Sequence, residues 1–215
     1  MRRFNADCPL CLSQAAEAFF EEAGRLYFSC SRCGLKFLDP SGRPSPEEER
    51  ARYLLHQNDV SDEGYRGFVK PLHDAIAGRV SRGGEGLDFG AGPGPVPADM
   101  LARSGYEVRL FDPFFHPNEA LLGRRYDFVV ACEVVEHLHD PAAEFKKLRG
   151  LLSPGGLLAV KTALHGPGTD FSRWHYRRDP THVAFYSRKS FMWVRDRHAF
   201  AAVEFPAPDV ILLTA

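Results

Sequence analysis

The segment Leu87–Gly94, Leu-Asp-Phe-Gly-Ala-Gly-Pro-Gly, constrains this 215-residue chain more than any other part of it. A short apolar strand leads into three glycines, Gly90, Gly92 and Gly94, and a helical segment follows. Glycines let the backbone turn sharply and let a ligand approach it closely, because no Cβ intervenes. A strand, a glycine-rich turn and a helix place that turn at the carboxyl edge of a parallel sheet, where open α/β folds bind nucleotides.

The spacing of the glycines and two nearby acids narrow the kind of ligand. The dinucleotide fingerprint GxGxxG needs a small residue where this chain has Pro95, so the spacing here is GxGxG. Asp88 directly precedes the loop, where we expect it to order the loop and to lie near an ammonium group of the ligand. Asp112 ends the next expected strand, where an acid accepts hydrogen bonds from ribose hydroxyls. A turn that only packs a strand against a helix is the alternative, and the two acids argue against it.

From residue 86 onward, short apolar segments alternate with segments of helical periodicity, and a helix is expected before them at 65–80. Expected strands occupy 86–89, 107–111, 126–132 and 157–162, and expected helices occupy 98–103, 141–152 and 187–197. Repeated βα units predict a parallel sheet with helices on both faces. Two late apolar segments at 201–205 and 210–214 predict a terminal antiparallel hairpin. The predicted fold is therefore α/β, a Rossmann-like doubly wound sheet that ends in this hairpin.

The bulk properties fit a globular protein with one principal domain. Hydrophobic residues make up 44% and charged residues 26% of the chain, which allows a sizeable core. The net charge of −1 gives no global electrostatic reason to bind nucleic acid or an anionic membrane. The first residues lack the pattern of a signal peptide, and no apolar run reaches membrane-spanning length. We therefore expect a soluble cytoplasmic protein.

Four of the five cysteines form two CxxC pairs near the N-terminus, Cys8 with Cys11 and Cys30 with Cys33. The pairs are separated by 18 residues, which is typical of a four-cysteine zinc ribbon. Each pair supplies two thiolates from a tight turn, and together they complete a closed tetrahedral site. A closed site has no open position, so the zinc is expected to be structural. Redox-active or vestigial cysteines are the alternative.

Composition divides the chain into three expected parts: a small zinc ribbon at 1–40, a linker and polar helix at 41–63, and the α/β domain at 64–215. Ser45 is placed to cap the polar helix, because acids fill the turn that follows it. The charged residues between the cysteine pairs are Glu17, Glu21, Glu22 and Arg25. This acidity argues against a ribbon that binds phosphate groups. It favours a ribbon that packs on the larger domain and covers its acceptor pocket as a roof.

Glu133, Glu136 and His137 follow the expected strand at 126–132. If a helical turn starts there, positions i, i+3 and i+4 share one face at the ligand edge of the sheet. Two carboxylates and an imidazole can bind Mg²⁺ or Mn²⁺, with His182 as a fourth ligand. The alternative is that Glu133 serves the ligand pocket, while Glu136 and His137 merely begin a helix.

The stretch around His182 also carries candidates for proton transfer. His182 or His175 can act as a general base, since an imidazole titrates near neutral pH. Tyr176 and Trp174 are expected to wall the pocket. The candidate catalytic residues are thus His182, His137 and Tyr176, and the alternative for His182 is a hydrogen-bonded structural histidine.

Taken together, residues 87–94, 109–113, 126–138 and 151–156 resemble the successive signature segments of class I S-adenosylmethionine-dependent methyltransferases, over about residues 65–215. The resemblance implies cofactor contacts from Asp88, Gly90, Gly92, Gly94, Asp112, Ala131, Cys132 and Glu133, with Asp112 on the ribose. One departure concerns the adenine site. Only 14 residues separate Asp112 from Asp127, so the third strand and its helix must be very short or absent, and the adenine contacts stay unassigned.

Two further resemblances concern the acceptor. The Glu-x-x-Glu-His segment with a later histidine is similar to metal-assisted O-methyltransferases, namely small-RNA 2′-O-methyltransferases and ubiquinone-pathway O-methyltransferases. There the ion lies beside the acceptor hydroxyl and lowers its pKa. A zinc ribbon before this domain, with the segment from Tyr53, resembles a bacterial methyltransferase group that acts on small metabolites or sugars. That resemblance implies that His56 and Asn58 reach the active site, and exposed helix positions are the alternative.

These observations predict methyl transfer from S-adenosylmethionine to a small-molecule acceptor, at oxygen. One alternative is an RNA methyltransferase that uses the ribbon as a reader, and the acidic ribbon counts against it. Another is a non-catalytic protein that binds the cofactor or uses zinc for an interaction. The sequence leaves the acceptor, the catalytic metal and the oligomeric state open.

Overall fold

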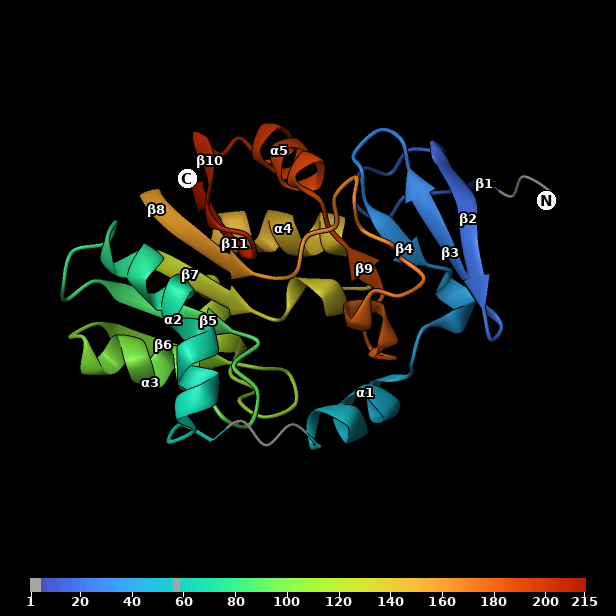
Figure 1. The fold of residues 1–215 in the computed structure, drawn as a ribbon. Coiled ribbons are helices and arrows are strands. Elements are labelled where there is room, and N and C mark those ends of the chain that lie inside the picture. Colours follow the sequence, from blue (N-terminus) through green and yellow to red (C-terminus); the bar gives the residue numbers. More distant parts are fainter. Residues whose placement is uncertain (1–4, 56–58) are drawn as a thin grey trace.

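The computed structural model describes residues 5–55 and 59–215 and contains two β-sheets (Figure 1). The larger sheet has six strands in the order β10-β11-β8-β7-β5-β6. Their bounds are β5 (Glu85–Phe89), β6 (Glu107–Phe111), β7 (Tyr126–Cys132), β8 (Leu152–Lys161), β10 (Ala202–Ala207) and β11 (Val210–Thr214). Strands β6, β5, β7 and β8 are parallel, and β11 pairs antiparallel with both β8 and β10. The predicted α/β sheet with a terminal antiparallel hairpin is confirmed.

Helices cover both faces of this sheet because side chains alternate along its central strand. Phe128 and Val130 of β7 face the cluster that contains α2 (Glu63–Ala77) and α3 (Val96–Arg103). Val129 and Ala131 face the opposite cluster, which contains α4 (Pro141–Gly150) and α5 (Arg188–Arg197). Strand residues that alternate in this way line the two faces of a sheet in turn. Within the described part of the chain, no helix is long and apolar enough to cross a membrane.

The expected strands and helices differ from the structure mainly at their ends. Strand β8 begins at Leu152 instead of residue 157, because the Pro-Gly-Gly segment that suggests a turn is drawn into the strand through an irregular pairing with β7. Between β6 and β7 the chain forms an isolated bridge from Asp112 to His116 and the 3-10 helix η2 (Glu119–Gly123). No β-strand lies between β6 and β7, as the short spacing predicts.

The smaller sheet, here called the N-terminal sheet, has five strands in the order β1-β2-β3-β4-β9. Its bounds are β1 (Asn5–Ala6), β2 (Ala16–Glu22), β3 (Arg25–Cys30), β4 (Lys36–Leu38) and β9 (Ala184–Phe185). Strand β9 comes from the predicted α/β domain, so one strand crosses the predicted boundary. The division at residues 40 and 63 stays a prediction. The four clustered cysteines share one continuous core cluster with Leu87, Val129 and Phe145 of the larger domain.

A 3-10 helix, η1 (Pro40–Gly42), follows β4, and three further short helical segments lie near the carboxyl edge of the larger sheet. Helix α1 (Pro46–Tyr53) starts after Ser45, whose hydroxyl accepts a hydrogen bond from the Glu48 backbone N–H in a capping box. The 3-10 helices η3 (Val135–His137) and η4 (His175–Arg178) follow β7 and precede β9, respectively. Figure 1 shows α1 below the space between the two sheets.

A glycine within the larger sheet, Gly86, provides a test of this packing. In β5, a Cβ at Gly86 would lie 2.1 Å from the Phe128 ring, which is fully buried. Replacing Gly86 with alanine forces the ring to move, so we expect Gly86→Ala to lower the free energy of unfolding by about 2–3 kcal/mol. In α4, a Cβ at Gly150 would meet nothing within 4 Å, so Gly150→Ala is the matched control. Urea denaturation curves compare the two, and equal stabilities would contradict the packing described here.

Candidate functional site

A cavity of about 910 Å³ opens at the carboxyl edge of the larger sheet. The predicted residues that line it are Asp88, Gly90, Gly92, Gly94, Asp112, Cys132, Glu133, His137 and His182. Ala131 does not line it, because alternation along β7 turns that side chain into the core, where it is fully buried. A second cavity of about 510 Å³ lies beside the end of α2, and none of the predicted site residues lines it.

The glycine loop owes its shape to two residues with left-handed backbone angles. Gly90 has φ +77° and Gly92 has φ +63°, a region that disfavours side chains. A Cβ at Gly90 would also lie 2.6 Å from the side chain of Val134, in the turn after β7. Gly94 lines the cavity without a positive φ, so only the first two glycines are required by the backbone.

Asp112 organises the loops on both sides of the cavity. Its Oδ2 accepts a hydrogen bond from the Gly92 N–H at 2.9 Å. Its Oδ1 accepts from the N–H groups of Phe114 and Phe115 at 2.8 and 3.0 Å. A carboxylate offers roughly four acceptor positions, so one remains for a ligand hydroxyl. Asp112 therefore shapes the binding site as well as lining it.

Asp88 lies beneath the glycine loop with only 1% of its surface exposed. Its Oδ2 accepts a hydrogen bond from the Ala98 N–H at 3.2 Å, at the start of α3. Burial raises the pKa of this carboxyl to about 7, and the charge of Asp112 adds to the rise. A cationic ligand group beside Asp88 would restore its ionised form.

The Glu-x-x-Glu-His segment adopts a different turn from the one predicted. Glu133 has φ +53°, and the chain continues into the 3-10 helix η3 instead of an α-helix. The side chains of Glu136, His137 and His182 each place one ligand atom within 4.8 Å of the others, and Glu133 is outside this group. Because Glu133 has a left-handed backbone angle and a 3-10 turn follows it, the predicted helical face of positions i, i+3 and i+4 does not form, although the Glu133 carboxyl stays close enough to Glu136 for their charges to interact. Burial and the charge of Glu136 raise the pKa of Glu133 to about 9.

Glu136 is fully buried and holds two hydroxyl groups. Thr162 Oγ1 donates to its Oε2 at 3.0 Å, and the Tyr176 hydroxyl donates to its Oε1. Tyr176 therefore stands behind the cavity instead of forming its wall, and burial raises its pKa well above the usual range. Trp174 does not line the cavity either, because it packs beside Tyr176 and Phe185.

Two histidines that line the cavity are held through the same ring nitrogen, Nδ1. His137 Nδ1 lies 3.1 Å from the Thr181 carbonyl oxygen, and His182 Nδ1 lies 2.6 Å from the Tyr176 carbonyl oxygen. A carbonyl only accepts, so each neutral ring carries its proton on Nδ1 and leaves Nε2 as an acceptor. The ring centroids are 4.7 Å apart. Desolvation lowers the pKa of His137, which favours its neutral form. The other candidate base, His175, is exposed and does not line the cavity.

Helix α1 supplies cavity residues that sequence reasoning missed. Glu49 and Tyr53 line the cavity, and the Tyr53 ring lies 5.2 Å from the His137 ring. Burial raises the pKa of the Tyr53 hydroxyl. The helix is polar and buries none of its residues fully, so its sequence resembles a solvated linker. Tyr53, the aromatic residue at the end of this helix, is the sequence feature that indicates a contact with the cavity. The predicted contacts from His56 and Asn58 fall outside the described residues.

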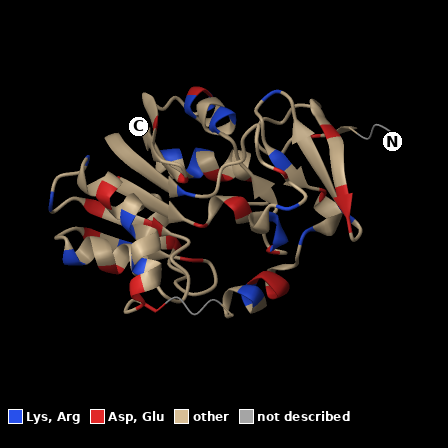
Figure 2. Cartoon of the chain, in the orientation of Figure 1, with Lys and Arg blue, Asp and Glu red and all other residues tan. Residues whose placement is uncertain are grey.

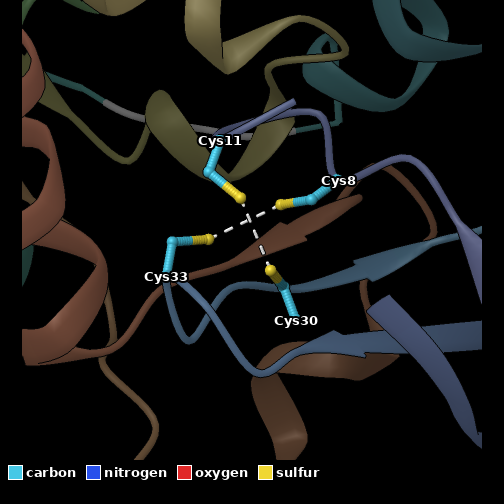
Figure 3. A group of neighbouring side chains, drawn as sticks. All are labelled: Cys8, Cys11, Cys30 and Cys33. Carbon is cyan, nitrogen blue, oxygen red and sulfur yellow. Dashed lines mark hydrogen bonds between the residues drawn. The ribbon is translucent and has the colours of Figure 1, made fainter. Parts of the chain in front are cut away.

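The four N-terminal cysteines converge on one point (Figure 3). The Sγ atoms of Cys8 and Cys33 are 3.5 Å apart, as are those of Cys11 and Cys30, and all four lie within 4.8 Å of one another. Four sulfurs at about 2.3 Å from a tetrahedral ion are separated by roughly these distances. The hydrogen bond with Cys30 raises the pKa of Cys8 to about 12, because neighbouring thiols do not readily share negative charge without a cation. The donor set and spacing fit zinc.

Charge is distributed without one dominant sign. Figure 2 shows basic and acidic residues interspersed over the elements of both sheets. In the N-terminal sheet, the acidic residues Glu17, Glu21 and Glu22 lie on β2, as the sequence places them.

Known proteins resemble this chain in both sequence and fold. A family model described as a methyltransferase domain matches residues 61–204. A ubiquinone biosynthesis O-methyltransferase from Azorhizobium caulinodans is 29% identical over 159 residues, covering 60% of this chain and 58% of that protein. A protein of the same name from Dinoroseobacter shibae is 36% identical over 84 residues, covering 38% and 33%. The chain thus spans little more than half of the first relative and a third of the second.

Two solved structures from Burkholderia thailandensis share the fold. An O-methyltransferase family protein has a TM-score of 0.59 at 15% identity and covers 81% of this chain and 64% of its own. A 1,6-didemethyltoxoflavin-N1-methyltransferase has a TM-score of 0.57 at 14% identity and covers 92% and 96%. These identities show a likeness of fold alone. Since the family model spans more than half of the sequence, the chain belongs to the methyltransferase domain family.

Proposed function

We propose that the protein is a class I S-adenosylmethionine-dependent methyltransferase and that it transfers the methyl group of this cofactor to a hydroxyl oxygen of a small molecule. In this proposal His182 is the general base and His137 lies beside it. The observation that carries the proposal is the pair of imidazoles that line the cavity, His137 and His182, each bound at Nδ1 to a backbone carbonyl so that its Nε2 is left as the acceptor. A base held within reach of an acceptor hydroxyl removes its proton as the oxygen attacks. The names of the relatives, which are O-methyltransferases, support oxygen as the atom.

The other side of the cavity is proposed to hold the cofactor, whose sulfonium supplies an electrophilic methyl group. Gly90 and Gly92 bring the backbone close to the methionine part, and Asp88 offers its carboxylate to the ammonium group. Asp112 keeps one acceptor position for a ribose hydroxyl. The proposed adenine site lies beside Phe114, since no third strand supplies the usual wall. Orientation is then the main contribution of the protein, because the methyl group is already activated.

A metal-assisted variant of this function rests on a separate observation. Glu136, His137 and His182 can each offer one ligand atom to a divalent ion. Two imidazoles with one carboxylate form a nitrogen-rich set, which suits Mn²⁺, Fe²⁺ or Zn²⁺ better than Mg²⁺. Both Glu136 oxygens already accept hydroxyl hydrogen bonds, which favours the metal-free mode.

We also propose that Cys8, Cys11, Cys30 and Cys33 bind one structural zinc ion, on the basis of their spacing and burial.

Replacing the proposed base tests the acceptor chemistry. We expect His182→Gln to lower kcat by about 10²–10⁴-fold, the usual contribution of a general base. The affinity for S-adenosylmethionine should stay within about twofold, because the glycine loop is untouched. His175→Gln, an exposed histidine close in sequence, is the control and should keep full activity. Labelled cofactor and a panel of small hydroxylated acceptors provide the assay, and unchanged kcat in His182→Gln would refute the role.

The same methyl-transfer assay distinguishes the metal-free mode, in which His182 acts as the base, from the metal-assisted mode. Activity that survives EDTA supports the metal-free base. Activity lost on chelation and restored by a divalent ion identifies the metal-assisted mode, and transfer to RNA but to no small molecule would overturn the proposed acceptor class.

Asp88 predicts how cofactor affinity changes with pH. In the free protein its pKa is about 7, so below pH 7 the carboxyl is mostly neutral and must lose a proton to pair with an ammonium group. Affinity for S-adenosylmethionine should therefore rise as pH increases from 6 to 8, by up to about tenfold per pH unit at the acid end. Calorimetry at several pH values measures this. Asp88→Asn should bind weakly and lose the dependence, and a flat profile in the unaltered protein would contradict the assignment.

The cysteine site predicts one zinc ion per chain. Metal analysis of the purified protein should find it, and Cys30→Ser should lose most of it, because a tetrahedral thiolate site loses one of its four ligands. Cys132→Ser is the matched control, since Cys132 lies in the cavity wall and outside the cluster. Zinc retained fully in Cys30→Ser, or absent from the unaltered protein, would exclude the site.

A further inference from the structure

Residues 163–186, here called the acceptor loop, connect β8 to α5 and carry both Tyr176 and His182. Their apolar side chains pack against the N-terminal sheet. Phe171 of this loop meets the ring of Tyr27 edge-on at 5.3 Å, and Phe185 lies 6.1 Å from the same ring. Leu38 and Tyr27 share one buried cluster with Phe171, Tyr176, Val183 and Phe185 of the loop. The N-terminal sheet is thus the surface on which the acceptor loop is built.

Val183, the residue after His182, is held by two backbone hydrogen bonds, one on each side. The Leu38 N–H, at the end of β4, donates to the Val183 carbonyl oxygen at 2.9 Å. The Val183 N–H donates to the Glu136 carbonyl oxygen at 2.9 Å. Ladder pairing then continues between Phe37 of β4 and Ala184 of β9. A single peptide therefore joins the N-terminal sheet to the turn that carries Glu136 and His137.

The second cysteine pair also holds the loop at both ends. The Gly34 carbonyl oxygen directly follows Cys33, and it accepts hydrogen bonds from His165 Nε2 at 3.0 Å and from Ser187 Oγ at 3.2 Å. The Gly34 N–H donates to the Cys30 carbonyl oxygen at 2.9 Å within the pair itself. These contacts make the cysteine turn and the two ends of the acceptor loop one connected unit.

A third contact reaches the turn immediately before His182. Arg25 Nη2 of β3 donates to the Pro180 carbonyl oxygen at 2.9 Å. Across the described residues 5–40, none lines the cavity itself, so the predicted roof over the acceptor pocket is not what the N-terminal sheet forms. Its contacts with the site run through the backbone beside His182.

We propose that the N-terminal sheet positions His182, so that Arg25 and the β4–β9 pairing set the placement of the base without touching the cofactor. The inference rests on the proposed function of His182. The glycine loop and Asp88 sit on β5 and α3, at the other side of the cavity, and do not depend on these contacts. Loss of the positioning contacts should therefore lower kcat and leave cofactor binding intact. Arg25 is a positioning residue in this scheme, since it acts through the backbone of Pro180.

The test compares Arg25→Ala with Arg32→Ala, which removes an exposed arginine between Cys30 and Cys33. We expect Arg25→Ala to reduce kcat on the order of tenfold, because small displacements of a catalytic group are costly. Its affinity for S-adenosylmethionine should stay within about twofold, and Arg25→Lys should recover part of the activity. Arg32→Ala should match the unaltered enzyme in kcat and in cofactor affinity.

A readout that does not need turnover completes the test. The imidazole signals of His182 in ¹H–¹⁵N spectra, assigned through His182→Gln, should shift in Arg25→Ala and stay in place in Arg32→Ala. Unchanged signals and kcat in a folded Arg25→Ala would overturn the positioning role. A loss of cofactor binding together with kcat would show general unfolding and would also overturn it. If the unaltered enzyme binds the cofactor but methylates no hydroxyl, the proposed function fails instead, and the spectra still report on the positioning.

Discussion

At Gly90 the backbone of the glycine loop passes so close to Val134 that a side chain on Gly90 would lie 2.6 Å from it. This approach brings the loop that begins the cofactor side of the cavity against the turn that carries Glu133, Glu136 and His137. Both segments are bent by left-handed residues, Gly90 on one side and Glu133 on the other. A glycine is required at the first position by both angle and space, while the non-glycine residue at the second stores strain of about 1 kcal/mol or more. The two segments that are proposed to hold the cofactor and the acceptor are therefore fixed relative to one another.

On the side of the cavity that is proposed to hold the acceptor, hydrogen bonds hold Glu136 and the two histidines beside it in place. Glu136 has no exposed surface, and each of its oxygens accepts a hydrogen bond from a hydroxyl, that of Thr162 or that of Tyr176. Buried polar groups are stable only when they are paired in this way. The backbone carbonyls of Tyr176 and Thr181 then fix the two imidazoles. The result is a pair of imidazoles held in place before any ligand binds, which is the preorganisation that the proposed proton removal requires.

Much of this architecture could be predicted from the sequence because it rests on local patterns. The nearly continuous apolar run in residues 126–132 identifies the central strand, and the short spacing from Asp112 to Asp127 predicts that the third strand is very short or absent, as the structure has it. The paired CxxC spacing places four sulfurs together, because each pair forms its own turn. Most of the predicted cofactor-binding residues, among them Asp88, Asp112 and Glu133, do line the cavity. They could be identified because ligands of such sheets bind at the carboxyl ends of the strands.

Other features depend on contacts between distant residues, and local patterns do not reveal them. The two residues of β9 carry no strand signal, and they pair with β4 only because the loop folds back across the N-terminal sheet. Tyr176 was expected at the cavity wall, yet its hydroxyl turns inward to Glu136, whose partner could not be known in advance. Glu133 was expected to share one helical face with Glu136 and His137, but it has a left-handed backbone angle that propensity does not predict and it is not one of the three clustered ligand residues.

The central claim is that an oxygen atom accepts the methyl group at the histidine pair. The most direct measurement is transfer from S-adenosylmethionine carrying a ¹³C-labelled methyl group, with NMR identification of the atom that bears the label in the product. An O-methyl carbon in a small-molecule product is the predicted result. A label found on nitrogen or carbon, or no transfer from bound cofactor to any hydroxylated compound, would contradict the claim.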